Sequence, residues 1–438
     1  MSEPGQSNLP GQSTQTTQGV LDINDDRPAT DDVLLTVENL DVHFGGAKTG
    51  VHAVRSVSYV VRSGETLGIV GESGSGKSVS SMAVMGLLPK TAHITGSVKF
   101  RGKELLGTND KTMSAIRGKR IAMIFQDPMT SLDPVYKIGH QIIETLKVHN
   151  SGMSRSRLRA RSVELLDLVG IPNASDRVDD FPHQFSGGMR QRVVIAIAMA
   201  NNPDVIIADE PTTALDVTVQ ATVLEAIKAA QRETGAALVL ITHDLGVIAG
   251  MADRVLVMYA GRAVEIGAVD DVFYRPRMPY TVGLLNSLPR MDTDEKLRLT
   301  PIIGSPPSLQ NLPPGCPFSP RCPLHIPACS EAEPPLVQVE GASLHLAACI
   351  RSDELKGQDR YEAGQVFEAT SSDEGLPIEF SGPAEIEPEP PRAGALHEPA
   401  APTMCGSGID PGVHAPAQER DPTAAPPVEH SPQDGDDR

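Results

Sequence analysis

Residues 71–78, Gly-Glu-Ser-Gly-Ser-Gly-Lys-Ser, decide the fold of this chain of 438 residues. The apolar run 65–70 directly before them reads as a short buried strand, and residues 79–88 after them read as a helix. In such a strand–loop–helix unit, glycines let backbone N–H groups surround phosphates at the positive end of the helix dipole. The segment therefore predicts a phosphate-binding loop in an α/β protein. A plain surface turn is the alternative, which the complete eight-residue pattern disfavours.

The loop residues have distinct expected roles. Lys77 should reach the β- and γ-phosphates of a nucleoside triphosphate, and the Ser78 hydroxyl should ligate Mg²⁺. The other nucleotide contacts are expected from Gly71, Ser73, Gly74, Ser75 and Gly76.

Three further apolar runs each end in a polar residue. Residues 121–125 lead to Gln126, residues 205–208 lead to Asp209 and Glu210, and residues 237–242 lead to His243. Ligands of open α/β sheets bind at the carboxyl ends of the strands, so we expect these side chains at one nucleotide site. Taken singly, each could instead have no catalytic role: Gln126 as a turn residue, Asp209 and Glu210 as a solvated strand end, and His243 as a structural histidine.

The expected chemistry of these four residues is hydrolysis of a nucleoside triphosphate. Asp209 suits a water-mediated contact to Mg²⁺, and Gln126 suits a contact to Mg²⁺ and water. Glu210 can orient and deprotonate the attacking water, and His243 can contact the γ-phosphate.

A second glycine motif occupies residues 185–191, Phe-Ser-Gly-Gly-Met-Arg-Gln. Ser186 can begin a helix over 187–200, with its hydroxyl and the helix N-terminus directed at a phosphate. The alternative is an ordinary helix cap. With this motif, the chain resembles the ATP-binding subunits of ABC transporters over roughly residues 33–290. It carries their motifs in order: the phosphate loop, Gln126, Ser186-Gly187-Gly188, Asp209-Glu210, Ala214-Leu215-Asp216 and His243.

The resemblance implies a head-to-tail dimer of two ATPase subunits. Each ATP would lie between the phosphate loop of one subunit and Ser186, Gly187 and Gly188 of the other, with Asp216 at the dimer seam. Phe44 falls where the family places an aromatic residue that stacks on adenine. Its alternative is a packing role in a strand, and His43 or an adjacent loop residue could share the contact. Met189 follows the two glycines where glutamine is widespread, a form that resembles the peptide-transporter branch.

The implied fold is an α/β ABC-type P-loop ATPase, with a RecA-like core, a small antiparallel β subdomain and a helical subdomain. We expect this domain over residues 33–288, with the helical subdomain at about 131–190, where residues 136–148 and 157–169 show helical apolar spacing. A small Cys-rich C-terminal extension is expected over residues 289–350.

The two ends of the chain have a different composition. Residues 1–32 are polar and carry a net charge of −5, and residues 351–438 are acidic and Pro-rich with a net charge of −13. Together they account for the net charge of −18 of the whole chain, so the middle is near neutral. We expect both ends to be disordered, and we expect no nucleic acid partner. No apolar run is long enough for a membrane span, and no signal peptide is recognisable.

The extension contains four of the five cysteines, Cys316, Cys322, Cys329 and Cys349. Residues 274–285 before it resemble the segment that leads out of the ATPase core in oligopeptide, dipeptide and nickel importers. No C-x-x-C pair is present, which disfavours zinc, whereas a [4Fe–4S] cluster needs four thiolates and accepts irregular spacing. We favour a structural cluster, with zinc and simple buried thiols as alternatives. Cys405 lies alone in the tail.

The sequence thus predicts an ATPase that energises import of dipeptides or oligopeptides from the cytoplasmic face of the cell membrane, as a peripheral subunit. The expected partners are a related but distinct ATPase chain, two membrane permease subunits and an extracytoplasmic substrate-binding protein. The same machinery could import nickel or another small solute. An iron–sulfur sensor and a non-transport ABC ATPase are more distant alternatives.

Overall fold

The computed structural model describes residues 32–46, 50–213, 215–287, 302–342 and 344–355, all of which belong to one compact unit, Met1–Pro377. Most of the two tails expected to be disordered, together with Cys405 and Ala214, lies outside the described residues. No helix in the described ranges is long and apolar enough to cross a membrane.

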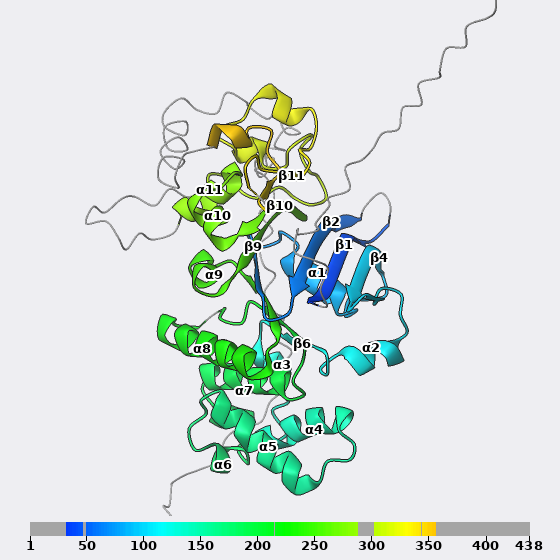
Figure 1. The fold of residues 1–438 in the computed structure, drawn as a ribbon, viewed down its shortest axis with the longest axis vertical. Helices are drawn as coiled ribbons and strands as arrows, with labels where there is room; N and C mark the ends of the chain where they lie inside the picture. The colour runs from blue at the N-terminus through cyan, green and yellow to red at the C-terminus, as the bar shows by residue number, and fades with distance from the viewer. Residues whose placement is uncertain (1–31, 47–49, 214, 288–301, 343, 356–438) are drawn as a thin grey trace, which may run out of the picture. The chain divides into compact units, whose positions relative to one another are not determined.

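The centre of the fold is an eight-stranded mixed sheet (Figure 1). Its parallel part places the strand before the phosphate loop between two neighbours, one of which is the strand that leads to His243. The strand that carries Asp209 comes next, on the far side of the His243 strand. In sheet order the strands are β11 (Val337–Gln338), β12 (Leu346–Ala347), β10 (Arg262–Ala268), β9 (Arg254–Tyr259), β3 (Thr66–Val70), β8 (Ala237–Thr242), β7 (Val205–Asp209) and β6 (Ile121–Ile124).

The parallel strands are apolar except at their ends because both faces of the sheet are covered. Along β7, Val205 and Ile207 point into one hydrophobic core, and Ile206 and Ala208 point into the other. Successive strand side chains point to opposite faces, so burial on both sides removes the polar alternation of a half-exposed strand. This explains why short continuous apolar runs were the correct signal for these strands.

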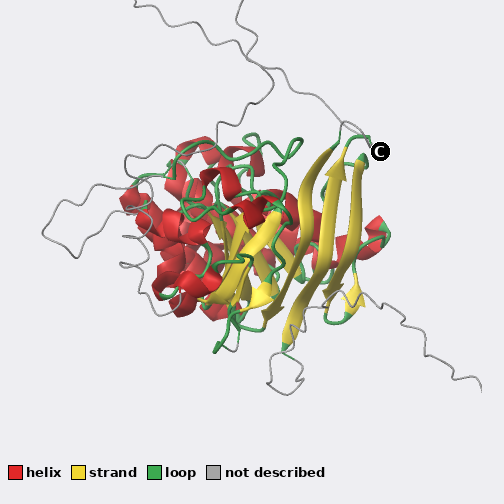
Figure 2. Cartoon of the chain, turned by 90° about the horizontal axis from the view of Figure 1, so that it is seen from above, coloured by secondary structure: helices red, strands yellow, loops and turns green. Residues whose placement is uncertain are grey.

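A second, four-stranded antiparallel sheet covers one side of this core (Figure 2). Its strands, in sheet order, are β2 (Val51–Arg62), β1 (Val33–Phe44), β4 (Ala92–Phe100) and β5 (Lys103–Glu104). Helix α1 (Lys77–Val84) contacts β1 and β2 on one side and β7 on the other. The helix that follows the phosphate loop is therefore clamped between the two sheets.

Most of the remaining helices cover the opposite face of the large sheet or lie beyond it, where α7 and α8 pack side by side, whereas α2 lies on the same side as α1 (Figure 1). The remaining helices are α2 (Asp110–Ile116), α3 (Pro128–Ser131), α4 (Ile138–His149), α5 (Arg155–Leu168), α6 (Ala174–Arg177), η1 (Pro182–Gln184), α7 (Gly187–Met199), α8 (Val217–Thr234), α9 (Leu245–Met251), α10 (Val269–Tyr274) and α11 (Pro279–Asn286).

The predicted helices exist with shifted ends. The segments predicted at 136–148 and 157–169 form α4 and α5, and α5 begins earlier because Ser154 accepts a hydrogen bond from the N–H of Arg157. Helix α1 begins at Lys77, ahead of the predicted start, and ends before Leu88. Gly76, at a φ of 100°, makes the sharp entry that allows this early start.

The C-terminal extension is built mainly from loops and short turns. Its regular elements are η2 (Ser319–Arg321), η3 (Pro327–Ser330), η4 (Ser352–Leu355), β11 and β12. The disordered tail was expected to begin at residue 351, but residues 351–355 are part of the described structure, and Leu355 is buried in the main core. The five residues after the expected boundary therefore belong to the folded protein.

A buried ionisable pair fastens the extension to the sheet. The Glu265 carboxylate on β10 lies 2.7 Å from Nε2 of His345, and these residues are 0% and 2% exposed. Glu265 also accepts hydrogen bonds from the backbone N–H groups of Arg277 and Met278, at 2.6 and 3.2 Å. A buried carboxylate is tolerated only when its oxygens are hydrogen-bonded, so this residue depends on all three partners.

We predict that Glu265→Ala lowers the free energy of unfolding by about 3–5 kcal/mol, because it leaves a buried imidazole and two N–H groups without an acceptor. Urea denaturation followed by circular dichroism measures the change. The matched control is Glu38→Ala, which breaks the ion pair to Lys99 in which the two side chains are 47% and 39% exposed. It should cost less than about 1 kcal/mol. Equal losses for the two variants would contradict the role of Glu265.

Candidate functional site

Two glycines of the phosphate loop, Gly71 and Gly76, have no room for a side chain. A Cβ atom on Gly71 would lie 2.2 Å from the carbonyl oxygen of Met258, and one on Gly76 would lie 2.5 Å from that of Ala53. Both have positive φ angles, 153° and 100°. The loop is thus packed directly against the β9 and β2 backbones, and its turn follows from glycine.

Lys77 is folded back over this loop. Its Nζ donates to the carbonyl oxygens of Gly71 and Glu72, at 2.7 and 3.0 Å, and the residue is only 4% exposed. Burial lowers the pKa of Lys77 below its ordinary value, although nearby carboxylates oppose the shift. The ammonium group is therefore held within the loop, where a phosphate could accept its hydrogen bonds.

Two of the three residues expected to bind a magnesium ion, Ser78 and Asp209, are in contact. The Ser78 hydroxyl donates to Oδ1 of Asp209 at 2.8 Å, which joins α1 to the end of β7. Burial raises the pKa of Asp209, and the hydrogen bond from Ser78 opposes that rise. Hydroxyl and carboxylate oxygens are the donors that Mg²⁺ prefers, so the residues fit this cation.

The Glu210 carboxylate, which follows β7, lies close to side chains that follow the neighbouring strands β6 and β8. Its Oε2 accepts hydrogen bonds from Nε2 of Gln126 at 3.2 Å and from the Thr213 hydroxyl at 2.8 Å, and it lies 3.5 Å from Nδ1 of His243. The Glu210 backbone has a φ of 46°, and its N–H donates to the carbonyl of Ile241. A left-handed backbone at a non-glycine residue is typical of functional sites, and here it turns the carboxylate towards Gln126 and His243.

The second glycine motif lies on different elements from the phosphate loop. The Ser186 hydroxyl accepts the N–H of Met189 at 3.3 Å and caps α7, and Asp216 accepts the N–H of Val219 at 3.0 Å and caps α8. A Cβ atom on Gly188 would lie 2.2 Å from Cγ1 of Val219, and one on Gly187 would lie 3.9 Å from Cδ2 of Leu215. The motif and Asp216 therefore form one unit at the starts of two packed helices.

Phe44 ends β1 and is half-buried against the core of the antiparallel sheet. The neighbouring His43 ring stacks on the His52 ring with centroids 3.6 Å apart, so that imidazole already has an aromatic partner. The stacking of Phe44 on adenine stays a prediction.

The four cysteines of the extension line one small cavity of about 20 Å³. The Cys316 sulfur accepts hydrogen bonds from the N–H groups of Phe318 and Ser319, and the sulfurs of Cys322 and Cys349 each accept one from a backbone N–H. Burial raises the pKa of the Cys316 and Cys322 thiols, and that of Cys349 to about 12. Thiolates would form here only with a cationic centre beside them.

The distances between these sulfurs indicate which metal centre the cysteines could hold as they are placed here. Among the described residues, no three cysteine sulfurs lie within 4.8 Å of one another. One zinc ion with Zn–S distances of about 2.3 Å needs four sulfurs closer than that. The cavity between the cysteines has the volume of about one water molecule.

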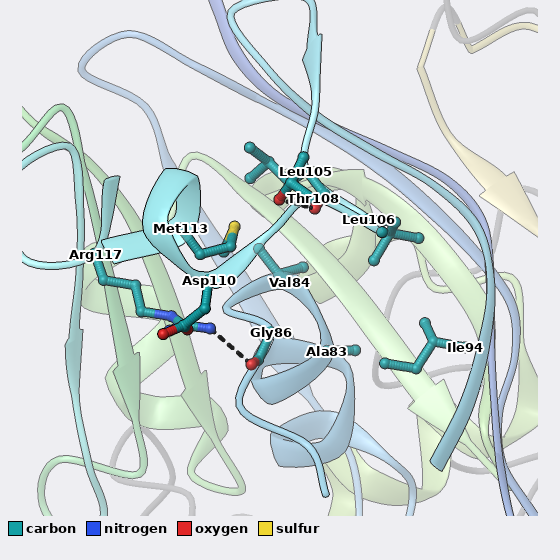
Figure 3. Close-up of a pocket in the computed structure, with 11 residues that line it drawn as sticks. Ala83, Val84, Gly86, Ile94, Leu105, Leu106, Thr108, Asp110, Met113 and Arg117 are labelled. Carbon is teal, nitrogen blue, oxygen red and sulfur yellow. Dashed lines mark hydrogen bonds and ion pairs between the residues drawn. The ribbon is translucent and has the colours of Figure 1, made fainter. Parts of the chain in front are cut away.

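A larger cavity, of about 230 Å³, lies elsewhere. It is bounded by the C-terminal end of α1, β4 and α2, with Val84, Ile94 and Met113 in its wall (Figure 3). Arg117 at its rim donates to the carbonyl of Gly86 at 2.7 Å. The phosphate loop is at the other end of α1, so this cavity is separate from the nucleotide site.

Some contacts of the site were not expected. Thr213 holds Glu210, and its position three residues later in the same turn was the available signal. Glu72 forms an ion pair with Arg321 and its N–H donates to the Tyr280 hydroxyl. No sequence pattern links residues so far apart in the chain.

Two regions of the chain match protein families. Residues 54–213 match the family described as ABC transporter, and residues 264–329 match the family described as oligopeptide/dipeptide transporter, C-terminal region.

Among curated proteins, the chain is similar to the oligopeptide transport ATP-binding protein OppD of Mycobacterium tuberculosis, with 57% identity over 325 residues. The match covers 74% of this chain and 53% of that protein, so the chain spans about half the length of this relative. It is 50% identical to OppD of Salmonella typhimurium, over 70% of this chain and 91% of that one. It is 53% identical to the dipeptide transport ATP-binding protein DppD of Bacillus subtilis, over 69% and 90%.

We predict that Gly188→Ala destabilises the fold by about 1–3 kcal/mol, because the added methyl group overpacks the contact of α7 with Val219. Thermal unfolding measures the change. Val219→Ala makes room for the added methyl group. The double variant Gly188→Ala/Val219→Ala should therefore lose less free energy of unfolding than the two single variants lose together. Strict additivity would show that the close approach of Gly188 does not matter.

Proposed function

Because the chain belongs to the ABC transporter ATP-binding family, we propose that it is the ATP-hydrolysing subunit of an importer of dipeptides or oligopeptides. The main support is that one chain carries two matched regions, the ABC region and the oligopeptide/dipeptide transporter C-terminal region. Its relatives in M. tuberculosis, S. typhimurium and B. subtilis are named for oligopeptide or dipeptide transport.

In the proposed mechanism, the phosphate loop and Lys77 bind the β- and γ-phosphates of ATP. Ser78 and Asp209 hold Mg²⁺, which neutralises charge on the phosphates when bound, and Gln126 adds a contact from β6. Glu210 is the general base that takes a proton from the attacking water. Its carboxylate is kept in place by Thr213, and His243 lies at the same strand edge to contact the γ-phosphate.

A second subunit would complete each site. Ser186, Gly187 and Gly188 cap α7, whereas the phosphate loop lies between β3 and α1. The exposed start of α7 offers a helix N-terminus for the γ-phosphate of ATP bound by a partner. Asp216 lies at the same surface, at the start of α8, and would line the seam. We favour a related but distinct ATPase chain as this partner.

The helical segment around α4 is the proposed contact to the membrane permease. Val135 and Tyr136, just before α4, are 74% and 50% exposed. Exposed apolar side chains of this kind mark interaction surfaces. Gln126, at the end of β6, joins this segment to Glu210 and could transmit the state of the nucleotide to two permease subunits. A substrate-binding protein outside the membrane would deliver the peptide, and this subunit would lie peripherally at the cytoplasmic face.

The proposal includes a [4Fe–4S] cluster held by Cys316, Cys322, Cys329 and Cys349. Support comes from the shared cavity and from backbone N–H groups directed at three of the four sulfurs, an arrangement that stabilises cluster-bound thiolates. When bound, the cluster would cross-link an extension that has little regular structure of its own. The cysteines themselves join η2, η3 and the segment after β12.

We predict that Glu210→Gln abolishes peptide uptake and lowers ATP turnover by about 100-fold or more, because the general base is lost while the phosphate contacts remain. Uptake of a labelled peptide by cells, and phosphate release by the purified transporter, measure these effects. Mg·ATP binding should be retained.

The matched change is Lys77→Ala, which should weaken ATP binding itself. Normal turnover by Glu210→Gln would overturn the assignment of the base. If Glu210→Gln lost its ATPase activity as expected but left peptide uptake unchanged, or abolished nickel uptake instead, the proposed substrate would be overturned.

We predict that the full-length chain, purified without oxygen, contains about four irons and four sulfides per chain. Cys322→Ser should lose this content, because one thiolate ligand is removed, whereas Cys405→Ser should keep it. Iron and acid-labile sulfide assays with metal analysis of the same samples give the readout. One zinc per chain, or no metal, would contradict the cluster.

A further inference from the structure

We propose that Arg321 of the extension is a positioning residue for ATP binding, because it neutralises and fixes Glu72 inside the phosphate loop. This inference goes beyond the proposed transport function, since it concerns how one chain prepares its own nucleotide site. It assigns a task to the extension that is independent of the peptide and of the cysteine centre.

The ion pair has the two-pronged geometry of a strong arginine–carboxylate contact. NH1 of Arg321 donates to Oε2 of Glu72 at 2.7 Å, and NH2 donates to Oε1 at 2.9 Å. The Arg321 side chain is 5% exposed and that of Glu72 is 25% exposed. Two parallel hydrogen bonds in a site largely shielded from water fix direction as well as charge.

Arg321 is itself held from several sides. Its Nε donates to the carbonyl of Ile303 at 3.1 Å, and NH2 also donates to that of Gly304 at 3.2 Å. NH1 reaches the Tyr259 hydroxyl at 3.2 Å, and the guanidinium lies 5.9 Å from the centres of the Tyr259 and Phe318 rings. The guanidinium therefore occupies one defined position in the docked extension.

The backbone of Glu72 is fixed as firmly as its side chain. Its N–H donates to the Tyr280 hydroxyl at 2.9 Å, and its carbonyl accepts from Nζ of Lys77 at 3.0 Å. Tyr280 is fully buried and packs on Tyr259 and Phe318, with ring centres 4.6 and 5.4 Å away. Residues from α11, β9 and the extension thus hold the loop through Glu72, the residue that follows Gly71.

The charge of Glu72 makes this contact matter for the ligand. The loop must receive a triphosphate, and an unneutralised carboxylate within it repels such an anion. The guanidinium cancels that charge only while the extension is docked. The extension therefore sets the electrostatic state of the phosphate loop, over 249 residues of sequence.

The test uses Arg321→Gln in the full-length chain, with equilibrium binding of Mg·ATP measured by competition with a fluorescent ATP analogue. The Kd should rise about tenfold, the size expected for one lost charge interaction of moderate strength. In the assembled ATPase, KM for ATP should rise while kcat stays within about twofold, because binding rather than the chemical step is affected.

Two companion variants distinguish loss of charge neutralisation at Glu72 from a general loosening of the docked extension. Glu72→Gln/Arg321→Gln removes the carboxylate as well, so its Kd should return to within about twofold of that of Glu72→Gln alone. Glu333→Gln removes the charge that pairs the extension with Arg55 and Arg262, at 2.5 and 3.0 Å, and lies outside the loop. Its Kd should equal that of the unaltered chain.

Three results would overturn the proposal: unchanged ATP binding by Arg321→Gln, a double variant as weak as Arg321→Gln, or an equal loss in Glu333→Gln. Binding of Mg·ATP by the isolated chain does not depend on which solute is carried. A chain that fails to support peptide uptake but shows the expected Kd pattern would contradict the proposed substrate and leave the role of Arg321 supported.

Discussion

The parallel register of four central strands is the constraint on which the nucleotide site depends. Val70 of β3 pairs with Thr242 of β8, Asp209 of β7 pairs with Ile241, and Ile124 of β6 pairs with Ala208. The residues that follow these strands therefore emerge at one edge of the sheet. A slip of one residue in any pairing would turn every side chain of that strand to the opposite face and move its catalytic residue away.

The same strands explain why the site is rigid. Their side chains enter two hydrophobic cores, so each strand is fixed from both faces. Glycines at 71 and 76 then let the loop lie against the backbones of β9 and β2. The Lys77 ammonium group donates a hydrogen bond to the carbonyl of Gly71 within the loop. Strain at Glu210, with its left-handed backbone, is sustained because the surrounding sheet and the Thr213 hydroxyl leave it no other arrangement.

Much of this arrangement could be predicted from local sequence. The apolar strands, the phosphate loop and the start of α7 at Ser186 all follow from patterns within a few residues of one another. The grouping of Gln126, Glu210 and His243 also followed, because parallel strands share an edge. The pair Glu72–Arg321 could not be predicted, since it depends on the docking of loops that have no periodic pattern. That the fold includes Leu355 was missed for the same reason.

The Glu265–His345 pair has a consequence for how much of the chain can stand alone. Strand β10 has β9 on one side and only the two-residue strand β12 on the other. A fragment ending at the cassette would lose that short cover and the imidazole, leaving the Glu265 carboxylate without its side-chain partner beside an open strand edge. Such edges recruit strands from other molecules, so we expect the isolated cassette to self-associate, and the natural unit for purification to run through the last turn of the extension.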